Sequence, residues 1–305
     1  MNLRVSALAL SVCTMQIALP SPASAQSAND PIELDLEVYG GRSVVPPDII
    51  ENDIDQARLE GVIGAAATAR FRADDTRIFA RVGAEVFPTD NLLNRYAFGI
   101  GASQDVRLAQ NGRIRLRLGA SLDHVEADDG RVFDRVRGDS QLIYRQGGGH
   151  TSVARVRYGY RDQSEDRFTG FDQTELLGEL RHTYRPAGSR SSVSVAAFVL
   201  DVEADEDRFS FQSIGARIIG RTPITDELTG FARVSYLNRD YEAPFSGVFP
   251  SERQDDVWRV SGGLEYQLSP SLIGFAEAGL IDHSSNIPTR DFSGALGRVG
   301  VRVKL

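Results

Sequence analysis

Cysteine and histidine, which build disulfide frameworks and many metal sites, are scarce in this sequence. Among 305 residues there is one cysteine, Cys13, and it lies in an N-terminal segment that we expect to be cleaved. The mature chain would then have no disulfide to stabilise it. The four histidines are dispersed along the sequence, so we predict no metal site and no cofactor.

Long apolar runs are also missing, because no stretch after residue 26 approaches the ~20 apolar residues of a membrane-spanning helix. At the N-terminus, one arginine precedes a mostly apolar stretch, residues 5–19, and Ala23-Ser24-Ala25 forms a small-residue cleavage site. This arrangement is typical of a secretory signal peptide. We predict a cleaved signal peptide over residues 1–25 and one exported domain over residues 26–305.

No helical periodicity extends over a useful length, and strict alternation takes its place. In RIRLRLGASLDHV, residues 113–125, positions 114, 116, 118, 120 and 122 are apolar, whereas the odd positions up to 123 are arginine, glycine, serine or aspartate. Successive side chains of a strand point to opposite faces. The segment therefore predicts a strand with one apolar and one charged face, as in a barrel surrounded by lipid.

The same alternation recurs in 14 segments along the chain. They lie near 32–40, 58–72, 76–87, 95–107, 113–125, 138–146, 151–161, 173–185, 191–202, 208–221, 227–239, 256–268, 271–281 and 292–305. In the segment 208–221 the alternation changes phase between Phe211 and Ile214, which predicts a β-bulge.

The connections between these segments alternate in length. Short turns rich in Gly, Pro, Asn or Asp alternate with longer polar connections, at 41–57, 88–94, 126–137, 162–172, 203–207, 240–255 and 282–291. Alternation of this kind is typical of outer-membrane barrels. We predict an all-β protein, a transmembrane antiparallel up-and-down β-barrel of about 14 strands with both termini periplasmic, in the outer membrane of a Gram-negative bacterium.

Aromatic residues are placed where such a barrel would meet the two membrane surfaces. Tyr158, Tyr160, Tyr236 and Trp258 fall on the lipid face near the outer rim, and Phe71, Tyr184 and Tyr266 fall near the periplasmic rim. Two aromatic girdles are expected of a barrel in a bilayer.

The inward face is rich in arginine, and the acidic residues gather in the long connections, for example at Asp48, Glu51, Asp53 and Asp55. This pattern predicts a porin-like channel that favours anionic solutes. In the alternative interpretation, inward Arg and Glu side chains pair with one another and fill the interior. The predicted pore-lining residues are Arg77, Arg81, Arg113, Arg115, Arg117, Arg155, Arg157, Arg181, Arg233, Arg259, Glu265 and Arg298.

The partners that this fold implies are outer-membrane lipid and glycolipid, the barrel-assembly machinery during biogenesis, and an anionic solute. Nothing in the sequence suggests a nucleic-acid partner, and no nucleotide-binding glycine pattern occurs.

A His-x-Ser pair, His283 and Ser285, stands beside Asp282 and Asn286 in the last long connection. Outer-membrane phospholipases carry a pair of this spacing, so a lipid hydrolase is an alternative function. Strand parity turns His283 inward, however, and loop tips collect Asp, Ser and Asn because these residues turn well. We therefore expect that the protein is not an enzyme.

The final hairpin contains Ser285-Asn286-Ile287-Pro288, then Asp291-Phe292, and spaced glycines at 297 and 300. With the preceding strand it resembles the C-terminal barrel of surface lipoprotein assembly modifiers, over about the last fifty residues. The resemblance implies a 14-stranded barrel that exports surface lipoprotein or polysaccharide. Residues 26–31 leave no room for the helical-repeat domain of that family, so separate periplasmic partners would be needed.

Overall fold

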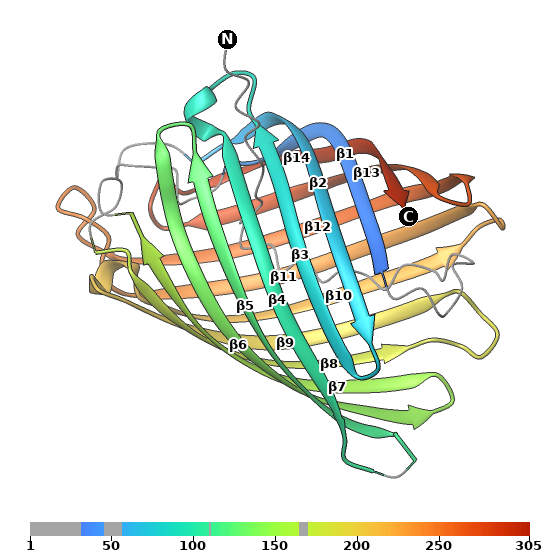
Figure 1. Ribbon diagram of the computed structural model, residues 1–305. Helices are drawn as coiled ribbons and strands as arrows, with labels where there is room; N and C mark the ends of the chain where they lie inside the picture. The colour runs from blue at the N-terminus through green and yellow to red at the C-terminus, as the bar shows by residue number, and fades with distance from the viewer. Residues whose placement is uncertain (1–31, 46–56, 110, 165–169) are drawn as a thin grey trace.

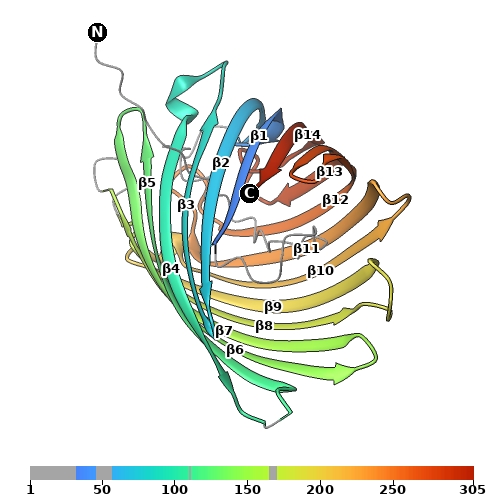
Figure 2. The same ribbon diagram turned by 45° about the vertical axis from the view of Figure 1, so that its right-hand side comes forward.

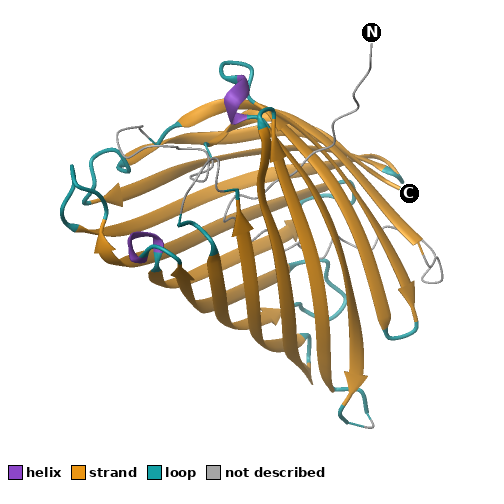
Figure 3. Ribbon diagram, turned by 60° about the vertical axis from the view of Figure 1, so that its left-hand side comes forward, coloured by secondary structure: helices purple, strands orange, loops and turns teal. Residues whose placement is uncertain are grey.

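The computed structural model describes residues 32–45, 57–109, 111–164 and 170–305. The predicted signal peptide and the acidic residues of the first long connection lie outside the described residues. No helix in the described part is long and apolar enough to cross a membrane. The two helices present there, η2 (Asn91–Leu93) and η3 (Asp207–Phe209), are single 3₁₀ turns in connections between strands (Figure 3).

Fourteen antiparallel strands form one closed barrel, in which β1 pairs with β14 and every other strand pairs with its neighbours in sequence (Figures 1 and 2). This confirms the predicted all-β fold, an antiparallel up-and-down barrel of about 14 strands. The strands are β1 (Ile32–Val44), β2 (Leu59–Ala73), β3 (Thr76–Val86), β4 (Arg95–Arg107), β5 (Ile114–Ala127), β6 (Gly130–Gly147), β7 (His150–Gln163), β8 (Gln173–Tyr184), β9 (Ser192–Ala204), β10 (Phe211–Pro223), β11 (Leu228–Pro244), β12 (Glu252–Ser269), β13 (Leu272–Ser285) and β14 (Phe292–Lys304).

The start of β1 and the end of the chain lie at the same end of the barrel. The N–H of Leu34 donates to the carbonyl of Leu305, and the N–H of Leu305 donates back to Leu34, both at 2.9 Å. We call this the terminal end, and the opposite end the loop end. Most turns at the terminal end are short, such as Asp74–Asp75 between β2 and β3.

Two local predictions were wrong. The predicted connection 126–137 belongs mostly to β6, which begins at Gly130. Its alternation was hidden because the outward residues here are charged: Asp134 accepts from Arg131 at 3.0 Å and contacts His124 at 2.6 Å. The predicted bulge in β10 is absent, since its pairing with β9 and β11 runs without a register shift. Phe211 simply lies on the inner face.

The outer face of the barrel is apolar. Ile214, Leu180, Leu280 and Val299 are each between 64% and 68% exposed, and their immediate neighbours in the strands are less exposed. Monomeric soluble proteins rarely expose a contiguous apolar surface of this extent. A closed barrel also leaves no backbone hydrogen bond open at a sheet edge, so this surface suits a lipid bilayer.

On the inner face, aromatic rings lie over glycines of the adjacent strand. A Cβ atom added to any of these glycines would come within 2.2 to 2.8 Å of the facing ring. Each ring thus occupies the space that a side chain opposite would need, which fixes both its rotamer and the strand register. The pairs are Tyr39–Gly64, Phe79–Gly101, Phe198–Gly215, Phe231–Gly263 and Phe275–Gly300.

We expect Gly263→Ala to lower the free energy of unfolding by about 1–3 kcal/mol, because the methyl group would overlap the Phe231 ring and the Ala276 carbonyl. The neighbouring Gly262 faces outward with only ordinary contacts, so Gly262→Ala is the matched control and should not destabilise the barrel. Denaturant unfolding in vesicles, followed by the fluorescence of the single tryptophan, measures both. Equal losses in the two variants would contradict this packing.

Candidate functional site: the charged inner face

Two buried aspartates organise the charged side chains of β3 to β6. Asp105 accepts from Arg117 at 2.6 Å and from Arg77 at 3.1 Å. Asp123 pairs with Arg81 and Arg137, and its second oxygen lies 3.4 Å from Arg135. Both carboxylates are almost fully buried, and each is held by arginines of more than one strand.

On the opposite wall, ion pairs reach across an intervening strand. Glu265 of β12 pairs with Arg221 of β10 and, at 3.3 Å, with Arg302 of β14. Arg302 also pairs with Glu37 of β1 at 2.7 Å. Glu179 of β8 pairs with Arg217 of β10 at 3.4 Å. These pairs lie on the face opposite to the exposed apolar side chains. Those made by Glu265 and Glu179 tie together strands that share no backbone hydrogen bonds, whereas Glu37 and Arg302 are direct partners in the register of β1 and β14.

Most of the predicted pore-lining residues belong to these networks. Arg77, Arg81, Arg115 and Arg117 pair with the two aspartates, Arg155 with Asp139, Arg157 with Glu175, Arg181 with Glu179, and Arg298 with Glu277 and Glu37. Arg113 was predicted to line the pore, but it precedes β5 and lies in an exposed turn at the terminal end.

Several members of the networks were missed by sequence reasoning. Arg135 and Arg137 fall in the predicted connection 126–137, but they belong to β6, which begins at Gly130. Glu37, Asp105, Asp139 and Glu175 have the same parity as the neighbouring arginines, so strand parity was the signal that could have found them.

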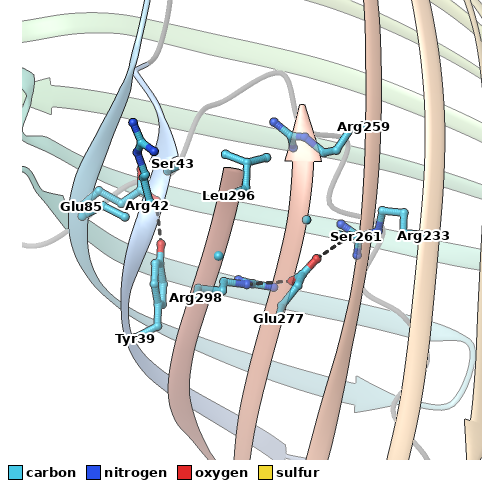
Figure 4. A pocket seen from close by; sticks show the side chains of 13 residues that line it. Tyr39, Arg42, Ser43, Glu85, Arg233, Arg259, Ser261, Glu277, Leu296 and Arg298 are labelled. Carbon is cyan, nitrogen blue, oxygen red and sulfur yellow. Dashed lines mark hydrogen bonds and ion pairs between the residues drawn. The ribbon is translucent and has the colours of Figure 1, made fainter. Parts of the chain in front are cut away.

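An open hollow in the inner wall is lined by several arginines, some of which have no carboxylate partner among the described residues. It has an empty volume of about 770 Å³ and is lined by residues of β1, β2, β3 and β11 to β14 (Figure 4). Its two carboxylates are engaged: Glu85 accepts from the Tyr39 hydroxyl at 2.7 Å, while Glu277 accepts from Ser261 at 2.8 Å and from Arg298 at 3.1 Å.

Three further arginines line this hollow: Arg42, Arg233 and Arg259. Within the described ranges, no carboxylate lies within 4.0 Å of any of their guanidinium groups, whereas the arginines of the networks each have such a partner. Arg233 and Arg259 come from adjacent strands, β11 and β12. The residue directly opposite Arg233 is Ser261, two positions after Arg259, so the two arginines are diagonal neighbours. The hollow therefore presents positive charge that its own carboxylates do not neutralise.

The His283–Ser285 pair is not assembled as a catalytic site. His283 is buried, and its Nε2 lies 3.3 Å from Asp255, which also accepts two hydrogen bonds from Arg253. The Ser285 hydroxyl instead accepts from the backbone N–H of Ile287 at 3.2 Å. Asn286 bonds to the backbone at Glu252 and Gln254, so these residues hold the last two connections of the loop end together.

The predicted girdle residues lie on the outer face. Tyr158 and Trp258 are about half exposed toward the loop end, as are Phe71 and Tyr266 toward the terminal end. Tyr236 is more covered, because its ring packs against Trp258 with centroids 4.7 Å apart and its hydroxyl donates to Asp256. Among the described residues, no group of three or more His, Cys, Asp or Glu could hold a metal ion.

No protein-family model matches the chain. No curated protein matches it. Solved structures to which the chain is similar include OmpT with loop L8 deleted, from Vibrio cholerae, at 10% identity and TM-score 0.49 over 90% of this chain and 98% of that chain. They also include an anion-selective porin from Comamonas acidovorans, at 9% identity and TM-score 0.44 over 90% of this chain and 99% of the porin chain. The outer membrane channel DcaP of Acinetobacter baumannii is similar at 9% identity and TM-score 0.48 over 90% of this chain and 96% of the DcaP chain. Likenesses at this level assign neither a family nor a function, and the resemblance to surface lipoprotein assembly modifiers stays a prediction.

We expect Asp123→Asn to lower the free energy of unfolding by about 1–3 kcal/mol, because it leaves the guanidinium groups around it without their shared carboxylate. The control is Asp226→Asn, since Asp226 is 99% exposed and pairs with Arg190 on the surface. An exposed pair contributes little, so this variant should change stability by less than about 0.5 kcal/mol. Unfolding midpoints in denaturant compare the two, and equal shifts would contradict the role of Asp123.

Proposed function

We propose that this protein is a porin-like channel of the outer membrane that favours anionic solutes. The observation that carries the proposal is the group of three arginines, Arg42, Arg233 and Arg259, which line a hollow in the inner wall without a carboxylate partner among the described residues. Unneutralised cations on a low-dielectric wall raise the local concentration of anions.

The pairing pattern decides which arginines matter for selectivity. Arg115 and Arg117 share Asp105 with Arg77, so their charge is partly neutralised and their main effect is on the wall itself. Among the described residues, Glu277 is the carboxylate whose charge acts on both Arg233 and Arg259, and Glu277 is already held by Arg298. Selectivity should therefore depend on a few unpaired arginines rather than on the total number.

The proposal includes a location and an orientation. Export through a cleaved signal peptide, insertion by the barrel-assembly machinery and contact of the apolar face with outer-membrane lipid and glycolipid all accord with an outer-membrane barrel. The terminal end, with the shorter turns, would face the periplasm. We assign no catalysis to His283 and Ser285, whose side chains are engaged elsewhere.

A second candidate is an export component for surface lipoprotein or polysaccharide that works with separate periplasmic partners. The dense ion pairing across the inner wall favours it, because such networks can fill a barrel of this size instead of lining an open pore. A folded barrel that conducts no ions in planar bilayers would support this candidate over the channel.

The test is the reversal potential of the refolded protein in planar bilayers under a KCl gradient. We expect a stable, anion-selective conductance. Replacing Arg233 and Arg259 together by Gln should lower the chloride-to-potassium permeability ratio by about twofold or more, because both unpaired charges are lost.

The control removes two charges elsewhere, through Arg185→Gln and Arg190→Gln in the exposed turn between β8 and β9. This variant should keep the selectivity of the parent protein. If both double variants lose selectivity equally, net charge and not the hollow is responsible. A cation-selective parent channel would rule out the anion preference.

A further inference from the structure

A polar cluster lies on the outer face near the terminal end, where β7 begins and β8 ends. It comprises His150 and Ser152 of β7 and His182 and Tyr184 of β8, which the antiparallel register places side by side. The two histidines are 32 positions apart in the sequence, yet their ring centroids lie 5.3 Å apart. The dispersed histidines of the sequence are therefore not all isolated in the fold.

Hydrogen bonds connect three of these side chains in a row. The Ser152 hydroxyl lies 3.0 Å from Nδ1 of His182, and Nε2 of His182 lies 3.1 Å from Nδ1 of His150. If Ser152 donates to His182, the His182 ring carries its proton on Nε2 and donates it to His150. His150 is fixed in turn by stacking on Tyr184, with centroids 4.5 Å apart. A nucleophile, a base and a group that orients the base are thus in line.

A strand irregularity adds a fifth side chain to the cluster. The pairing of β6 with β7 shifts register between Arg145 and Gly147, so Gln146 is an extra residue in β6. Its side-chain amide donates to the Ser152 hydroxyl at 2.9 Å. Bulges often re-aim a side chain next to a functional site. This amide is a donor within reach of a carbonyl oxygen bound at Ser152.

The surroundings indicate the class of substrate. One step further along the barrel, Leu142, Ala154 and Leu180 form a cross-strand row on the same face, with Leu142 and Leu180 at 45% and 68% exposure. The cluster therefore lies where the polar rim meets the apolar band. In a membrane lipid, the ester bonds occupy this boundary and the acyl chains extend into the apolar region.

We propose that Ser152 and His182 form a hydrolytic site for the acyl esters of membrane glycerolipids, with His150 as a positioning residue. The oxygen of Ser152 forms a bond to the ester carbonyl carbon while its proton passes to Nδ1 of His182. Collapse of the tetrahedral intermediate breaks the bond to the alcohol, which leaves with that proton. Water, deprotonated by His182, then releases the fatty acid and restores Ser152. This activity is independent of solute passage through the barrel.

The test uses the full-length protein refolded into phosphatidylcholine vesicles, with fatty-acid release measured by mass spectrometry. We expect hydrolysis by the parent protein and a loss of about 100-fold or more in Ser152→Ala and His182→Ala. A fluorophosphonate probe should label Ser152, as located by peptide mass. Ser285→Ala is the matched control and should keep full activity.

Folding of each variant is checked by heat-modifiable migration on gels, so a loss of activity is not confused with a loss of structure. For the positioning residue, His150→Gln retains an acceptor for His182, whereas His150→Phe does not. The Gln variant should keep the larger share of kcat at unchanged KM. A folded parent protein that neither hydrolyses the lipid nor reacts with the probe would overturn the proposal, as would full activity in Ser152→Ala.

Discussion

Closure of the sheet between β1 and β14 is the constraint on which the other features of this protein depend. A bilayer supplies no hydrogen-bond partners for an open strand edge, so a sheet surrounded by lipid has to pair its first strand with its last. Closure then divides every strand into an inner and an outer set of side chains. The apolar set meets the surroundings, and the charged set is confined to the interior, where its members must find partners.

The charged interior meets this requirement by sharing. Asp105 and Asp123 each pair with several arginines. Glu265 of β12 pairs with Arg221 of β10, beyond β11, and with Arg302 of β14, beyond β13. Arginine suits such sharing because its planar guanidinium presents several donors in fixed directions. The pairs also explain why a high arginine content is a poor measure of the field inside the barrel. At the hollow lined by Arg233 and Arg259, the carboxylates of the described residues are already engaged, and positive charge is left over.

The outer face is not uniformly apolar, and its exceptions are informative. Polar side chains gather at the two rims, where they pair with one another: His124 with Asp134 near the loop end, and Ser152 with His182 and His150 near the terminal end. At these depths a polar side chain avoids the cost of burial in hydrocarbon and remains beside apolar neighbours. The rim is thus the region of a barrel in which a reactive group can meet a lipid ester.

Much of this structure was determined by the sequence itself, because a period of two is visible wherever one face is apolar and the other polar. That pattern predicted all 14 strands, the inward parity of the arginines and the outward parity of the girdle aromatic residues. It failed at Gly130–Arg137, where outward residues are charged and the contrast between the faces disappears. The tertiary structure alone decided which arginines are neutralised and which histidines meet, since these contacts depend on the register between strands and on side-chain reach. Alternation assigns a residue to a face, but only the closed and registered barrel assigns it a neighbour.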